Sequence, residues 1–127
     1  MFLDANVLFS AAYRSHSGLR SLWELTGVEL LSSAYAVEEA RRNLAEQAHV
    51  DRLAELQRTL EIVPELPEAE YKDLPILGSA IGAHANYLLT GDITHFGHLF
   101  GKSIRLVRIL TPAEYLRSRL GGARGPH

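Results

Sequence analysis

Short apolar segments alternate with longer helical patterns along most of this chain. Strands are predicted by the apolar runs at residues 2–3, 28–31, 62–63, 87–90 and 104–110. Helices are predicted by apolar spacing and capping signals at residues 19–26, 34–48, 53–60, 75–81 and from 112 onward. Brief apolar strands that alternate with helices form parallel sheets covered by helices. We therefore expect an α/β fold with three layers, α/β/α, around a parallel sheet of four to five strands.

The size and composition indicate one globular domain. The chain has 127 residues, of which 46% are hydrophobic and 22% charged, enough to form a single core. We assign residues 1–120 to this domain and residues 121–127 to a flexible tail. The absence of cysteine excludes disulfides and thiolate zinc sites and suits a reducing, cytoplasmic location. No apolar run approaches the roughly 20 residues that span a bilayer, so we expect no membrane segment.

Four carboxylates occupy related places in this pattern. Asp4 and Asp92 follow predicted strands, Asp73 begins the helix before the strand at 87–90, and Glu39 lies early in the helix at 34–48. Ligands of open parallel sheets collect at the carboxyl ends of the strands. Carboxylates gathered there repel one another unless a cation neutralises them, and Mg²⁺ or Mn²⁺ prefers oxygen ligands. The pattern predicts a metal site at this edge, although a turn, a helix cap or a solvated helix face would explain each acid separately.

These positions also resemble a known family. Residues 1–8 are similar to the opening of PIN-domain nucleases, a strand followed by Asp-Thr-Asn or Asp-Ala-Asn. Residues 33–44, 73–80 and 87–92 resemble that family's second, third and fourth motifs, and residues 110–116 fit its usual ending. The resemblance covers residues 1 to about 116, and the motifs follow one another in the order typical of the family.

The resemblance implies a sheet ordered about 3-2-1-4-5 and a metal-dependent endoribonuclease that hydrolyses RNA phosphodiester bonds, often the toxin of a type II toxin–antitoxin pair. It implies that Mg²⁺ or Mn²⁺ and catalysis depend on Asp4, Glu39, Asp73 and Asp92. Asn6 is then expected to contact the metal ligands, and Thr90 to help position Asp92 or a water. A homodimer and an antitoxin partner are implied as well.

Several assignments remain open. Glu38 adjoins Glu39 and could take its place by a shift of one residue. His95, Arg41 and Arg42 could contact phosphate or could simply be exposed polar residues. The net charge of −2 argues weakly against nucleic acid, but the remainder is positive once four carboxylates are assigned to metal.

Two other functions compete with the nuclease. A haloacid-dehalogenase-like phosphatase also begins with a strand and an aspartate, but it needs a second acid where this chain has Asn6. A PIN-like scaffold that binds RNA or protein without catalysis often lacks one of the acids, whereas all four positions are filled here. For the homodimer, we expect an apolar interface on the two helices at 19–26 and 34–48, with contributions from Trp23, Tyr35, Val37 and Leu44.

Overall fold

The computed structural model describes residues 1–14, 18–64 and 75–123. Within these ranges the strands form one six-stranded sheet, ordered β3-β2-β1-β4-β6-β5 and parallel except for the β5–β6 pair. The strands are β1 Phe2–Leu3, β2 Leu31–Ser33, β3 Glu61–Val63, β4 Tyr87–Leu89, β5 Ser103–Ile104 and β6 Val107–Leu110. The fold is α/β, as predicted, and the predicted order 3-2-1-4-5 holds once β6 is taken as the fifth strand.

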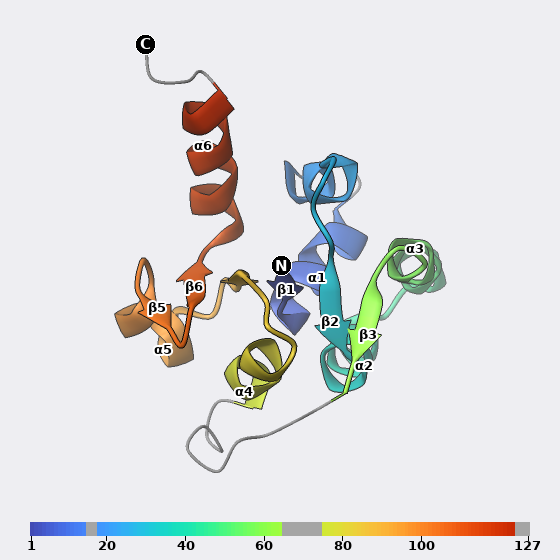
Figure 1. The fold of residues 1–127 in the computed structure, drawn as a ribbon. Helices are drawn as coiled ribbons and strands as arrows, with labels where there is room; N and C mark the ends of the chain where they lie inside the picture. The colour runs from blue at the N-terminus through green and yellow to red at the C-terminus, as the bar shows by residue number, and fades with distance from the viewer. Residues whose placement is uncertain (15–17, 65–74, 124–127) are drawn as a thin grey trace.

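The helices surround this sheet (Figure 1). They are α1 Ala5–Tyr13, η1 Gly18–Glu24, α2 Ala34–Asn43, α3 Gln47–Gln57, α4 Pro75–Gly82, α5 Ile93–Phe96, η3 Gly97–Leu99 and α6 Pro112–Ala123, where η marks a 3₁₀ helix. Helix α1 packs against α2 and α3, while α4 contacts β2 and β4, an arrangement compatible with three layers. Among the described residues, no helix has both the length and the apolar character needed to cross a bilayer.

The two central strands form the centre of the core. Phe2 and Leu3 in β1 and Leu88 and Leu89 in β4 are fully buried, as expected for strands covered on both faces. The backbone N–H of Asp4 donates to the Leu89 carbonyl at 3.1 Å, one step beyond the last residue of β1. The core therefore fixes Asp4 at the carboxyl end of the sheet.

The prediction of one continuous strand at residues 104–110 is wrong. Arg105 and Leu106 have φ values of 47° and 72° and form a two-residue turn, which pairs Ile104 with Val107 and makes β5 antiparallel to β6. Positive φ at both central positions is the geometry of a tight hairpin, which normally selects Asn or Gly. Neither occurs here, so the sequence resembles an unbroken strand and the sheet has one strand more than predicted.

Replacing Leu106 with glycine is expected to stabilise the protein. A non-glycine residue in left-handed backbone destabilises the folded state by about 1–2 kcal/mol. Glycine removes this cost, but its greater freedom in the unfolded chain cancels about half of the gain. The Leu106 side chain is 91% exposed and contributes little packing. Urea unfolding should show a gain of about 0.5–1 kcal/mol. Leu106→Ala, which removes the side chain but keeps the strained φ, should show none; equal midpoints for the two variants would contradict the explanation.

Two other elements differ from prediction because polar residues occupy buried positions. No helix is predicted at residues 5–13, yet Asp4 caps α1 there. Strand β2 covers residues 31–33 rather than 28–31, because the Ser32 hydroxyl donates to the Leu3 carbonyl at 2.9 Å and so permits a buried serine in a central strand. Ser33 ends this strand and caps α2, as predicted.

Helix boundaries account for further differences. The predicted helix at 19–26 is a 3₁₀ helix that ends at Glu24, and the one at 34–48 ends at Asn43 because Leu44 is extended and buried. Leu60 lies beyond the end of α3. Helix α6 has the predicted capping box between Thr111 and Glu114 and reaches residue 123, inside the expected tail.

The predicted surplus of apolar surface is largely absent. Val37 and Leu44 are buried within the domain. Trp23 is partly buried against the core, and its indole N–H donates to the Leu56 carbonyl at 3.0 Å. Only Tyr35 of the four named residues is exposed, so the apolar basis for the expected dimer interface is wrong.

Candidate active site

Asp4 lies at the point where β1 passes into α1. Its side chain is only 6% exposed. One carboxylate oxygen, Oδ1, accepts the Ala5 backbone N–H at 2.7 Å. The other, Oδ2, accepts the Thr90 hydroxyl at 2.7 Å and, more weakly, the Asn6 amide at 3.4 Å. The sheet and the start of α1 thus hold a carboxylate out of bulk water.

Burial raises the pKa of Asp4 above its ordinary value. Desolvation is the largest cause, and the charge of Asp92 acts in the same direction. The hydrogen bonds from Thr90, Ala5 and Asn6 oppose the shift without cancelling it. A buried carboxylate that faces a second negative charge is a favourable place for a cation.

Thr90 and Asn6 join the two sides of the site. Besides its bond to Asp4, the fully buried Thr90 hydroxyl accepts the backbone N–H of Asp92 at 3.0 Å and the Asn6 amide at 3.3 Å. The Asn6 amide oxygen accepts the Gly91 N–H at 2.8 Å. These contacts hold the Gly91–Asp92 turn after β4 against the start of α1.

Asp92 caps the short helix α5. Its Oδ1 accepts the His95 backbone N–H at 3.1 Å, and its Oδ2 lies 2.7 Å from the His95 ring Nδ1. Desolvation acts to raise the pKa of Asp92, but the backbone and ring hydrogen bonds of His95 outweigh it and lower the pKa. The two aspartates therefore have pKa values displaced in opposite directions, a pattern found at functional sites.

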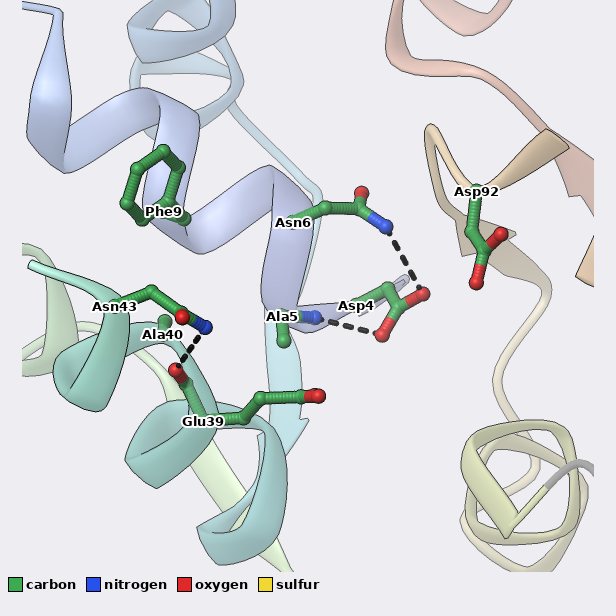
Figure 2. Close-up of a pocket in the computed structure, with 8 residues that line it drawn as sticks. All are labelled: Asp4, Ala5, Asn6, Phe9, Glu39, Ala40, Asn43 and Asp92. Atoms are coloured by element: carbon green, nitrogen blue, oxygen red, sulfur yellow. Dashed lines mark hydrogen bonds between the residues drawn. The ribbon is translucent and has the colours of Figure 1, made fainter. Parts of the chain in front are cut away.

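Helix α2 contributes Glu39. This side chain is half-buried, and the Glu39 backbone carbonyl accepts the Asn43 amide N–H at 2.9 Å. Figure 2 shows its carboxylate directed toward Asp4. Glu38 is exposed instead and pairs with Arg41, so the geometry places Glu39 rather than Glu38 beside the other acids.

Three of the four predicted carboxylates line one cavity of about 420 Å³. Its walls come from β1, α1, α2 and the turn after β4 (Figure 2), and its lining residues are Asp4, Ala5, Asn6, Phe9, Glu39, Ala40, Asn43 and Asp92. A cavity of about 210 Å³ shares Asp4, Glu39 and Asp92 and adds Tyr35 and His95 among its walls. Asp73 lies outside the described residues. The structure thus brings together acids from three distant parts of the chain.

The donor chemistry fits a hard divalent cation, but the acids are not close enough to share one ion. Within residues 1–14, 18–64 and 75–123, no three His, Asp or Glu side chains are grouped at metal-binding distance. Carboxylate oxygens are the ligands that Mg²⁺ and Mn²⁺ favour, and the desolvated Asp4 beside Asp92 supplies the negative field. Occupation of this site by metal would require the side chains to draw together.

Of the three candidate phosphate-binding residues, the structure places His95 beside the acids and Arg41 and Arg42 away from them. His95 lines the smaller cavity through its contact with Asp92. Arg41 and Arg42 are exposed in the last turn of α2, line neither cavity, and Arg41 is paired with Glu38.

Phe9 and Asn43 also line the larger cavity, and neither was expected from the sequence. Phe9 could have been found only if α1 had been predicted, because it lies one turn after Asn6 on that helix. Asn43 could have been found from its i+4 spacing from Glu39, which places both side chains on one face of α2.

Comparison of the chain with protein-family models, curated proteins and solved structures gave no significant match.

Proposed function

We propose that this protein is a PIN-type endoribonuclease that depends on Mg²⁺ or Mn²⁺. The observation that carries the proposal is a cavity at the carboxyl edge of a parallel sheet, lined by the buried Asp4 and by Glu39 and Asp92 from two other parts of the chain. The motif resemblance adds Asp73 as a fourth acid and a three-layer PIN-like arrangement of the fold. The toxin role, a homodimer and an antitoxin partner belong to the same proposal and depend on the resemblance alone.

Each residue has a defined part in this mechanism. Asp4, Glu39, Asp92 and Asp73 would hold the metal. When bound, such an ion lowers the pKa of a water and stabilises charge on phosphate oxygens. Thr90 and Asn6 keep the Asp4 carboxylate aimed at the cavity, and His95 holds Asp92 through two hydrogen bonds. Neutralisation of the acids also removes the repulsion that an RNA phosphate would meet there.

The direct test is cleavage of fluorescent single-stranded RNA of mixed sequence by the purified protein. Cleavage is expected with Mg²⁺ or Mn²⁺ and is expected to stop in EDTA. The melting temperature should rise with Mn²⁺ concentration, because a ligand that binds only the folded state stabilises it. Absence of cleavage in every metal would favour the scaffold function, and full activity in EDTA would exclude the mechanism.

Glu39→Gln and Glu38→Gln form a matched pair for this assay. Both remove one charge from adjacent positions of α2, but only Glu39 lines the cavity. Glu39→Gln is expected to raise the Mg²⁺ concentration needed for half-maximal cleavage by at least about tenfold, the size of effect found when a metal site loses a supporting contact. Glu38→Gln should leave it unchanged. The opposite result would move the ligand to Glu38.

A further inference from the structure

An aromatic column runs away from the acidic cavity along α1. The rings of Phe9 and Tyr13 are stacked with centroids 5.4 Å apart and planes 13° apart. Tyr13 also contacts the ring of His49 in α3, with centroids 4.8 Å apart and planes tilted by 54°. The spacing of four residues places Phe9 and Tyr13 on the same face of the helix.

One end of this column forms part of the cavity wall. Phe9 lines the cavity together with Asp4, Glu39 and Asp92, and Figure 2 shows Phe9 and Asn43 toward one end of it and Asp92 toward the other. The stack with Tyr13 supports the Phe9 ring from within the column. A flat apolar surface is therefore held in place beside the proposed phosphodiester site.

Simple packing between α1 and α3 does not account for the whole column. Tyr13 is 50% exposed, and Phe9 is only partly buried, so both rings retain surface that could meet a ligand. Asn43 beside Phe9 donates its amide N–H to the Glu39 carbonyl, and its amide oxygen is of the chemical type that accepts a base N–H. An aromatic face next to an amide is a common arrangement for recognising an unpaired base.

We infer that Phe9, supported by Tyr13 and His49, is a stacking site for an unpaired base of the RNA substrate. The inference rests on the proposed function and deepens it by assigning a base-contacting residue beside the proposed phosphodiester site. A base within a duplex has both faces covered and its edge paired, so it must leave the helix before it can lie against Phe9. The cavity of about 420 Å³ falls within the roughly 300–1,000 Å³ range of ligand sites.

The first test detects base binding without cleavage. The protein with labelled aromatic side chains is titrated with adenosine 5′-monophosphate in EDTA and followed by NMR. The Phe9 ring resonances are expected to shift upfield, because a base stacked on that ring shields them. Ribose 5-phosphate, which has the phosphate but no base, should not shift them. Equal shifts with both compounds, or none with either, would overturn the inference.

The second test uses cleavage kinetics. Phe9→Leu keeps an apolar side chain but removes the ring, and it is expected to raise KM for single-stranded RNA about tenfold with kcat nearly unchanged, within the range of base–aromatic stacking. Phe9→Tyr should restore KM. Tyr87→Leu is the matched control, because Tyr87 is a half-buried ring in contact with Tyr115 at the start of β4, the opposite end of that strand from Asp92.

The outcomes separate the inference from the proposed function. Metal-dependent cleavage with the same KM in Phe9→Leu and wild type, or equal cleavage of duplex and single-stranded RNA, would overturn the stacking site and leave the nuclease intact. Base-specific NMR shifts without cleavage in any metal would overturn the nuclease and support the stacking site.

Discussion

Asp4→Asn is expected to abolish RNA cleavage while making the metal-free protein more stable. The substitution keeps the shape of the side chain and removes the charge that a divalent cation would require. Loss of one charge contact at a metal site should cost several kcal/mol in the transition state, which corresponds to about a thousandfold or more at ~1.4 kcal/mol per tenfold. Asp4 is the most buried of the described acids in the site, so its charge is the least screened by water.

The gain in stability follows from the raised pKa of Asp4. The folded protein holds the Asp4 proton more tightly than the unfolded chain, so ionisation of Asp4 costs stability as the pH rises from the ordinary value, 3.8, through the raised one. The cost is fully present above the raised pKa and absent well below pH 3.8. Asparagine carries no charge at either pH, so the variant should melt higher than wild type in EDTA at pH 7 and lose that advantage in acid.

Two measurements test the expected loss of cleavage and the expected gain in stability. Cleavage is assayed with Mn²⁺ in excess, and melting is followed in EDTA from pH 3 upward. Glu38→Asn serves as the control, because Glu38 is an exposed acid paired with Arg41 outside the cavity; it should retain cleavage and show no gain in stability. Cleavage by Asp4→Asn within about tenfold of wild type would reject Asp4 as a metal ligand. A lower melting temperature at neutral pH would show that the hydrogen bonds outweigh the burial of charge.

The sequence was most informative where local chemistry and long-range packing agree. Phe2 and Leu3 form a completely apolar strand, and an acid directly after it must lie at the sheet edge. The Thr111–Glu114 capping box is a local pattern and appears as predicted. These features required no knowledge of contacts between distant residues.

The missed features depend on such contacts. Ser32 belongs to a strand because its hydroxyl reaches the Leu3 carbonyl, a partner that the sequence does not reveal. The turn at Arg105 and Leu106 lacks the residues that its backbone normally selects. Phe9 reaches the cavity only because Asp4 caps an unpredicted helix. Asp4, Glu39 and Asp92 could be predicted to lie at one edge of the sheet, but the distances between their carboxylates depend on side-chain conformation.

Thr90→Val is expected to weaken both the fold and the activity. Valine fills nearly the same volume but loses the hydroxyl that donates to Asp4 and accepts from Asp92 and Asn6. A buried polar group without its partner costs about 1–3 kcal/mol, and loss of a contact that orients a metal ligand typically lowers activity by about 10–100-fold. Urea unfolding and RNA cleavage measure the two effects. Thr90→Ser, which keeps the hydroxyl, should recover most of both.

The pH profile distinguishes positioning of Asp4 from simple loss of stability. The Thr90 hydrogen bond lowers the pKa of Asp4, so its removal should raise that pKa further and move the acid limb of the cleavage profile to higher pH. Ser32→Ala is the matched control: it also removes a buried hydroxyl, but one bonded to the Leu3 carbonyl rather than to a carboxylate. It should lower stability and leave the profile in place. An unshifted profile for Thr90→Val would mean that the hydroxyl supports the fold without tuning Asp4.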